Sequence, residues 1–79
     1  MAIQVYVGNL SPQTIQGAIR RLFQPYGYIT SIHLMADNAG RPCGFAFVTM
    51  DTYGAGKAIT ALHKKEVDGQ NITIHIRLV

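Results

Sequence analysis

The sequence predicts an α+β domain in which one four-stranded antiparallel sheet carries two helices on one face and leaves the other face bare. Apolar residues alternate along four segments and recur at helical spacing along two others. These segments follow one another as strand, helix, strand, strand, helix and strand. The chain has 79 residues, too few to cover both faces of such a sheet with helices.

The strand predicted at residues 43–50 is apolar on both faces. Alternation places Cys43, Phe45, Phe47 and Thr49 on one face, and Gly44, Ala46, Val48 and Met50 on the other. Helices can cover only one of them, and the strand itself leaves both choices open. Two phenylalanines on the open face would mark a binding surface.

The first half of the chain supplies a strand, a helix and a second strand. Residues 3–9 alternate, with Val5 and Val7 opposite Tyr6. A helix is predicted from about residue 14 to 24, with Thr14 as its N-cap. Its buried stripe would consist of Ile15, Ala18, Ile19, Leu22 and Phe23. Residues 28–35 form the second strand, joined to the third by a loop of hairpin length.

The second half repeats this pattern. A helix is predicted over 52–63, with Ala55, Ala58, Ile59 and Leu62 buried and with a start weakened by Gly54 and Gly56. An Asp-Gly turn at 68–69 leads into the last strand, 71–79. In that strand Ile72, Ile74 and Ile76 would face inward, and Thr73, His75 and Arg77 outward.

This element order is the split βαβ, or ferredoxin-like, arrangement, and we expect residues 1–79 to form a single domain. Right-handed crossovers would place both helices on the same side of the sheet. The order does not reveal which face of each strand is bare, because strand registers cannot be read from the sequence.

Composition narrows the functional classes. The net charge of +3 permits an anionic partner without demanding one. A single cysteine, Cys43, excludes an internal disulfide and any CxxC motif, and the three histidines lack the spacing of zinc ligands, so no cofactor or metal is expected. No segment has the length of a membrane span or the pattern of a signal peptide, so we expect the cytoplasm, or the nucleus in a eukaryote.

Two segments resemble the signature motifs of RNA recognition motif (RRM) domains. Residues 5–10, Val-Tyr-Val-Gly-Asn-Leu, resemble the RNP hexamer, and residues 43–50 resemble the RNP octamer, Lys/Arg-Gly-Phe/Tyr-Gly/Ala-Phe-Val-x-Phe/Tyr. The likeness extends over the whole chain, and the start at Met1 suggests the short single-domain members found in bacteria.

The resemblance implies a sheet order of 4-1-3-2 and settles the choice of faces. Tyr6, Phe45 and Phe47 would lie on the bare face and stack bases of single-stranded RNA. The residues expected under the helices are Val5, Val7, Gly44, Ala46 and Val48, with the small Gly44 and Ala46 letting the helices approach closely.

Polar groups around the three rings would read base edges. The candidates are His33, Thr73, His75, Arg77 and the backbone after Leu78. The octamer departs from its pattern at Cys43, where Lys or Arg normally meets a phosphate, and Arg41 in the preceding loop is the candidate replacement. With so few cations, we expect micromolar RNA binding that depends only weakly on salt.

Two other functional classes compete with RNA binding. Some RRM-like domains hold a protein partner instead, and the missing octamer cation favours that alternative slightly. An enzyme on the same topology would need a paired carboxylate site, but the four acidic residues all fall in predicted loops or turns. The expected partner is single-stranded RNA, with single-stranded DNA or a protein as alternatives, and the chain is expected to be a monomer that binds no membrane.

Overall fold

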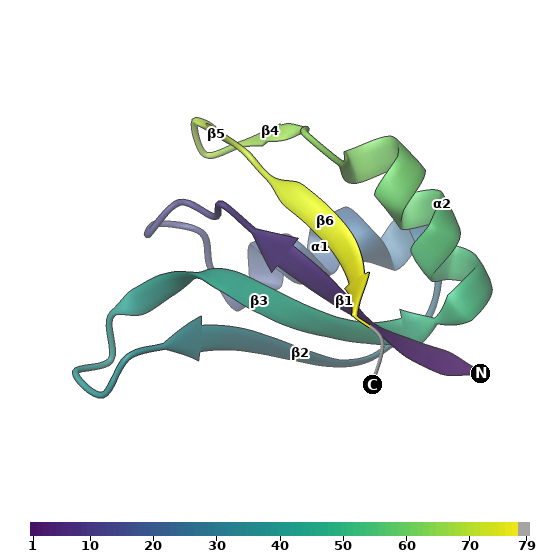
Figure 1. Cartoon of the computed structure of the whole chain (residues 1–79), viewed down its shortest axis with the longest axis horizontal. Coiled ribbons are helices and arrows are strands. Elements are labelled where there is room, and N and C mark those ends of the chain that lie inside the picture. Colours follow the sequence, from purple (N-terminus) through teal and green to yellow (C-terminus); the bar gives the residue numbers. More distant parts are fainter. Residues whose placement is uncertain (78–79) are drawn as a thin grey trace.

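The computed structural model describes residues 1–77 and contains the predicted elements together with a small extra hairpin (Figure 1). In chain order these are β1 (Ala2–Gly8), α1 (Gln16–Phe23), β2 (Ile29–Ala36), β3 (Pro42–Asp51), α2 (Thr52–Leu62), β4 (Glu66–Val67), β5 (Gln70–Asn71) and β6 (Thr73–Arg77). A short 3-10 helix, Gln24–Tyr26, continues α1. The four long strands form an antiparallel sheet in the order β2-β3-β1-β6, which confirms the predicted order.

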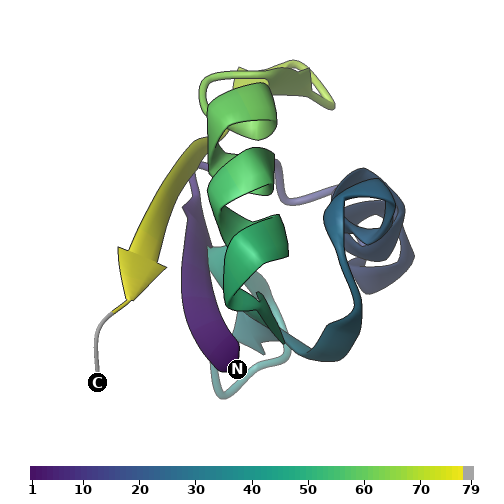
Figure 2. The same cartoon turned by 90° about the vertical axis from the view of Figure 1, so that its right-hand side faces the viewer.

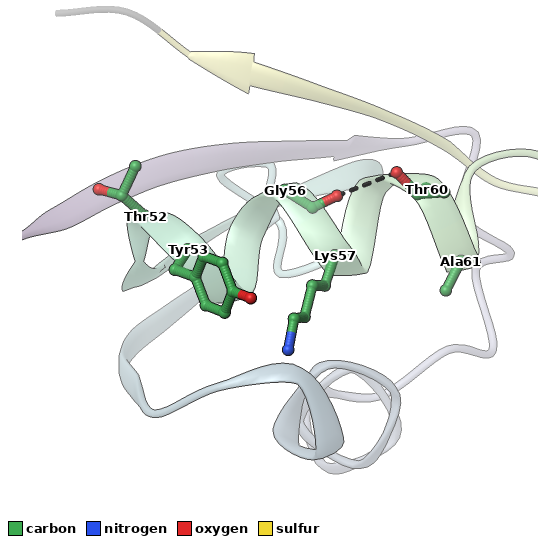
Figure 3. Close-up of a pocket in the computed structure, with 6 residues that line it drawn as sticks. All are labelled: Thr52, Tyr53, Gly56, Lys57, Thr60 and Ala61. Atoms are coloured by element: carbon green, nitrogen blue, oxygen red, sulfur yellow. Dashed lines mark hydrogen bonds between the residues drawn. The ribbon is translucent and has the colours of Figure 1, made fainter.

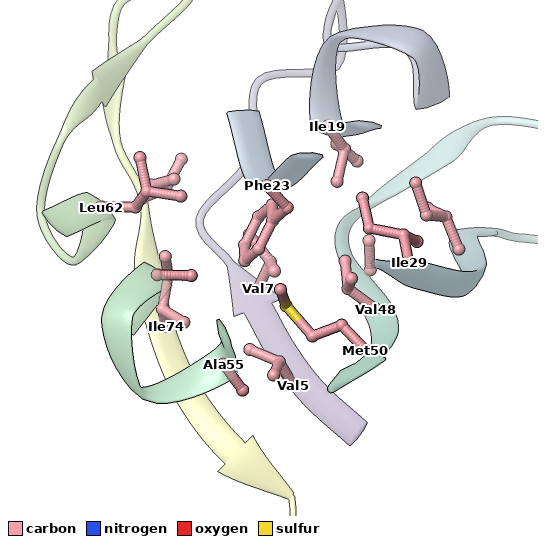
Figure 4. Close-up of a cluster of buried hydrophobic side chains, with 14 of the residues drawn as sticks. Val5, Val7, Ile19, Phe23, Ile29, Val48, Met50, Ala55, Leu62 and Ile74 are labelled. Atoms are coloured by element: carbon pink, nitrogen blue, oxygen red, sulfur yellow. The ribbon is translucent and has the colours of Figure 1, made fainter. Parts of the chain in front are cut away.

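Both helices lie on one side of this sheet, as Figure 2 shows. Neither of them is long and apolar enough to cross a membrane, and the same is true of every helix within residues 1–77. Phe23 of α1 lies at the centre of the core and points toward Val7 and Met50 (Figure 4). The fully buried members of the core include Val5, Val7, Ile19, Phe23, Ala46, Val48, Met50, Ala55, Ala58 and Ile72. The predicted helix-side residues Val5, Val7, Ala46 and Val48 are therefore confirmed.

The first helix starts later than predicted. Ile15 is its N-cap residue and is 62% exposed, so its assignment to the buried stripe is wrong. Thr14 does not cap the helix either. Its buried hydroxyl donates a hydrogen bond to Asp68 Oδ2 at 2.8 Å and so ties the start of α1 to the β4–β5 hairpin. A cap would satisfy a nearby helix N–H, whereas this bond joins two loops distant in sequence.

Gly44 has a different role from the one predicted. Leu34 pairs with Ala46 while Ala36 pairs with Pro42, so β3 has two more residues than β2 in this interval and bulges. Gly44 has a φ of +86° there, a conformation that glycine adopts without strain. Its carbonyl accepts a hydrogen bond from the backbone N–H of Leu10 at 2.9 Å. The glycine is thus needed by the backbone of β3, and not by an approaching helix.

The last strand is shorter than predicted. Residues 66–71 form the β4–β5 hairpin, with positive φ at Asp68 and Gly69, and β6 begins only at Thr73. Ile72 and Ile74 are buried as expected, and Ile76 lies on the same inward face, because it pairs with the buried Val5, but it is 43% exposed. Ile76 lies on the edge strand, where the helices no longer cover it. The backbone after Leu78, a predicted contact, lies outside the described residues.

The start of α2 is held by two contacts that offset its glycines. The Asp51 carboxylate accepts hydrogen bonds from the backbone N–H groups of Tyr53 and Gly54, at 3.1 and 3.2 Å, and caps the helix. Gly54 packs against the segment after α1, where an added Cβ would collide with the carbonyl oxygen of Tyr26 and lie 3.0 Å from Gly27 Cα. Gly56, one half-turn further, has no such neighbour within 4 Å.

These two glycines should therefore respond in opposite ways to substitution by alanine. We expect Gly54→Ala to lower the free energy of unfolding by about 1–3 kcal/mol, because backbone atoms must move apart. Gly56→Ala should raise it by about 0.5–1 kcal/mol, because alanine favours the helix and meets nothing. Urea unfolding of the two variants measures both values. Equal effects at both positions would contradict the close contact between α2 and the Tyr26–Gly27 backbone.

Candidate nucleic-acid interface

Three aromatic rings form a continuous cluster on the sheet face opposite the helices. The ring centroids of Tyr6 and Phe45 are 5.8 Å apart, those of Tyr6 and Phe47 are 5.9 Å apart, and those of Phe45 and Phe47 are 5.7 Å apart. Tyr6 pairs directly with Phe47 across β1 and β3. Each ring is half-buried, because the rings shield one another while no helix covers them. The predicted face is therefore confirmed, and its rings are open to a flat ligand.

Gly8 makes room for the Tyr6 ring, a role that the sequence does not reveal. A Cβ at position 8 would lie 2.6 Å from the Tyr6 hydroxyl oxygen and 2.9 Å from Thr73 Oγ1. The Tyr6 side chain therefore lies along β1, over the bare backbone of Gly8 and toward Thr73. The half-buried Thr73 pairs with Gly8 across β1 and β6, so this predicted residue lies at the end of the ring cluster.

The other two predicted residues of β6 contact the rings directly. The exposed His75 pairs with Tyr6 across the strands, and its ring stacks on that of Tyr6 with a centroid distance of 6.2 Å and an interplanar angle of 20°. The exposed guanidinium of Arg77 lies 4.6 Å from the centroid of Phe47, which is a cation–π contact. One aromatic surface thus continues from the central strands onto the edge strand β6.

His33 and Cys43 lie on strands that flank the cluster. His33 is exposed and pairs with Phe47 across β2 and β3, which puts it on the bare face beside a ring. Cys43 is an exposed free thiol next to the bulge of β3. It carries no charge that would attract a phosphate, so the octamer position stays without its usual cation.

Arg41 is already engaged by a carboxylate in its own loop. Its Nε donates to Asp37 Oδ2 at 3.1 Å, and Asp37 Oδ1 accepts the backbone N–H groups of Ala39 and Arg41 at 2.9 Å each. The backbone N–H of Arg41 is the main cause that lowers the pKa of the Asp37 carboxyl, and the Ala39 N–H and the Arg41 guanidinium add to it. The carboxylate is therefore charged at neutral pH and partly neutralises the only candidate replacement for the octamer cation.

His63 extends the aromatic surface and was not among the predicted residues. It follows α2 directly, and its ring lies 5.6 Å from that of His75 in an edge-to-face arrangement. Its Nδ1 accepts a hydrogen bond from the backbone N–H of Ile74 at 2.9 Å. The sequence marks it only as a residue at a helix end, because the hydrogen bond and the ring contact of its side chain are with a strand that begins ten residues later.

An open hollow lies on the outer side of α2, away from the rings. It has a volume of about 670 Å³ and is lined by Thr52, Tyr53, Gly56, Lys57, Thr60 and Ala61 (Figure 3). Lys57 Nζ lies 4.5 Å from the centroid of the Tyr53 ring, and Thr60 Oγ1 donates to the Gly56 carbonyl at 3.2 Å. The lining residues include no carboxylate, histidine or cysteine.

Residues 1–77 contain no group of three or more histidine, cysteine, aspartate or glutamate side chains that could hold a metal ion. What the site combines is stacked rings, exposed histidines and one arginine on a flat sheet. Such a surface suits a ligand with flat faces and polar edges.

The fold and the two motifs define the family. The sequence model of the RNA recognition motif family matches residues 5–73, so the chain belongs to this family. Among solved structures, the RNA-binding protein PG1 is 34% identical, with a TM-score of 0.92 over 98% of this chain and 95% of that one. A structure of the Sxl-lethal protein in complex with RNA is 29% identical, with a TM-score of 0.88 over 95% of this chain and 47% of that one.

The sequence is also similar to a longer curated protein. It is 42% identical over 78 residues to glycine-rich RNA-binding protein 1 of Mycosarcoma maydis. The alignment covers 96% of this chain and 45% of that protein. The chain thus spans less than half the length of this relative. The relative is fungal, so the expected likeness to short bacterial proteins finds no support.

Gly8 gives a test of the ring cluster that needs no ligand. In Gly8→Ala we expect the Tyr6 ring to turn away from Thr73, since the added Cβ meets the far end of a movable side chain. The core should stay intact, because the new methyl group lies on the bare face. Nuclear Overhauser contacts from the Tyr6 ring to His75 and Phe45 measure the change. Unchanged contacts would show that the ring does not depend on Gly8.

Proposed function

We propose that the chain binds single-stranded RNA by stacking bases on Tyr6, Phe45 and Phe47, and that it catalyses no reaction. The observation that carries the proposal is the cluster of three rings on the uncovered sheet face, with centroids 5.7–5.9 Å apart. Every base has a π face, and one stacked base contributes about 1–3 kcal/mol. Three rings at this spacing can hold two or three nucleotides.

Polar groups around the rings would then read the base edges. His33, Thr73 and His75 pair with β-strand neighbours on the bare face and offer hydrogen bonds there. Stacking alone tolerates any base, so hydrogen bonds from these polar groups to the base edges are the source of any sequence preference. Membership of the RRM family supports this use of the face.

The small number of cations near the rings limits the affinity for RNA. Arg77 is the one cation in contact with the rings within residues 1–77, and Arg41 is paired with Asp37. Each phosphate contact on a single strand adds only about −0.7 to the slope of log K against log salt. We therefore propose micromolar affinity for the domain alone and a role in RNA processing, stability or translation in which other contacts add strength.

Removing either phenylalanine ring should weaken binding. We expect Phe45→Ala and Phe47→Ala each to lower the affinity for a mixed-sequence RNA hexanucleotide by about tenfold, the equivalent of about 1.5 kcal/mol per stacked base. Tyr53→Ala removes an exposed ring from the helix side and serves as the matched control, with no expected effect. Titration monitored by backbone amide shifts gives both the affinities and the surface.

The same titration distinguishes the competing functions. Shifts confined to the sheet, with both phenylalanine variants impaired, agree with the proposal. No response of the wild type to millimolar RNA would rule it out and leave a protein partner as the remaining candidate. Unchanged affinity in both phenylalanine variants would exclude the rings as the binding surface.

Asp37 should restrain RNA binding through Arg41. Asp37→Asn keeps an Oδ1 atom for the Ala39 and Arg41 N–H groups but removes the charge that pairs with the guanidinium. We expect tighter RNA binding and a salt slope steeper by about 0.7, corresponding to one new phosphate contact. Affinities measured at several salt concentrations give the slope.

Glu66→Gln provides the control for net charge, because this exposed carboxylate lies on the β4–β5 hairpin, far in sequence from Arg41. Both variants raise the net charge by one unit. If they bind RNA equally well and with equal salt slopes, the release of Arg41 is not the cause.

A further inference from the structure

His63 lies past the free edge of the sheet. In the strand order β2-β3-β1-β6, strand β6 is the outer strand and has no further partner within residues 1–77. Ile74 of this strand pairs with Val7 of β1 on the inner edge. Its backbone N–H donates a hydrogen bond to His63 Nδ1 at 2.9 Å on the outer edge. The His63 side chain therefore occupies a hydrogen-bonding position that an additional strand would use. Figure 1 shows the end of α2, from which His63 follows, leading toward the β4–β5 hairpin beside β6.

The hydrogen bond fixes the proton on the His63 ring. A backbone N–H can only donate, so Nδ1 carries no proton and the neutral ring has its proton on Nε2. Within residues 1–77, Nε2 has no hydrogen-bond partner. Every buried side-chain nitrogen in these residues does have a partner, so Nε2 is not fully buried. Nε2 is thus not sealed from solvent, and in this tautomer it can act only as a donor. A donor held in a fixed direction at the end of an aromatic surface is suited to recognition.

The ring of His63 continues the surface formed by the central strands. His75 stacks on Tyr6 at 6.2 Å, and His63 meets His75 edge-to-face at 5.6 Å. Aromatic side chains therefore follow one another from Phe45 and Phe47 through Tyr6 and His75 to a ring beyond the sheet edge. The half-buried His63 is held between α2 and β6, so its position is set by the fold.

We propose that His63 holds a further nucleotide, next to those stacked on Tyr6, Phe45 and Phe47. The Nε2–H group donates to an acceptor atom of that nucleotide, either on its base or on its phosphate, while His75 provides the adjoining ring. This inference rests on the proposed RNA-binding function. It assigns to the end of α2 a part in setting the length of the RNA segment that the domain recognises.

The test compares His63→Asn with the wild type on two RNAs. Asparagine Oδ1 takes the place of Nδ1 and keeps an acceptor for the Ile74 N–H, but the Nε2–H donor and the ring are lost. Affinities are measured by titration with a mixed-sequence trinucleotide and a mixed-sequence hexanucleotide. We expect unchanged binding of the trinucleotide and about fivefold weaker binding of the hexanucleotide, the equivalent of one net hydrogen bond.

A third RNA distinguishes the two acceptors. This hexanucleotide keeps its three central bases and has abasic residues at the outer positions. If the variant binds it as tightly as the wild type, the acceptor is on the base. If the variant is again weaker, the acceptor is on the phosphate. Both results support the proposal, since in both the loss requires a nucleotide beyond the central three.

Two outcomes would overturn the inference. His63→Asn could bind the hexanucleotide as well as the wild type, or it could lose both RNAs equally, which would place the effect at Tyr6 and His75. In both cases RNA binding itself stands. Failure of the wild type to bind either RNA would instead overturn the proposed function. Imidazole ¹⁵N shifts of His63 in the wild type provide a check that is independent of variant stability: they should move with the hexanucleotide and not with the trinucleotide.

Discussion

The geometry of the bare face depends on the register between β1 and β3. The same pairing that sets Val5 opposite Val48 in the core sets Tyr6 opposite Phe47 on the other side. A slip by one residue would turn the valines to solvent and the rings into the core. Each buried valine side chain contributes about 1.5–3 kcal/mol, so the core strongly favours one register. The ring cluster is therefore positioned by residues that never touch it.

Periodicity predicted the four long strands and the two helices, because it records what each residue does within its own strand or helix, whereas the resemblance to RRM domains was needed to choose the bare face. Periodicity failed where a residue serves a partner distant in the chain. Thr14 is of a residue type that often caps helices, but its hydroxyl donates a hydrogen bond to Asp68, 54 positions away. Gly54 weakens the helix by its low propensity. However, α2 can approach the Tyr26 carbonyl only because Gly54 has no side chain. Contacts of this kind cannot be inferred from local spacing.

The same distinction holds for the candidate site. Alternation along β6 placed His75 and Arg77 on the bare face, and the structure adds that each lies against a particular ring. His63 could not be found in this way, since it follows a helix and reaches the surface through a bond to a strand edge. The pairing of Arg41 with Asp37 was easier to predict from the sequence, because the two residues are four positions apart. It nevertheless depends on the conformation of the loop.

Arg77 shows how a surface with little charge can still favour a base. Its guanidinium covers Phe47 at 4.6 Å, so a base that stacks on this ring must displace it. An exposed cation–π contact contributes about 0.5–1 kcal/mol, whereas a stacked base contributes about 1–3 kcal/mol. The exchange is favourable even before the released guanidinium meets a phosphate. In the structure the guanidinium lies against the Phe47 ring, and in the proposed complex its displacement would free a cation for a phosphate, although the octamer has none at Cys43.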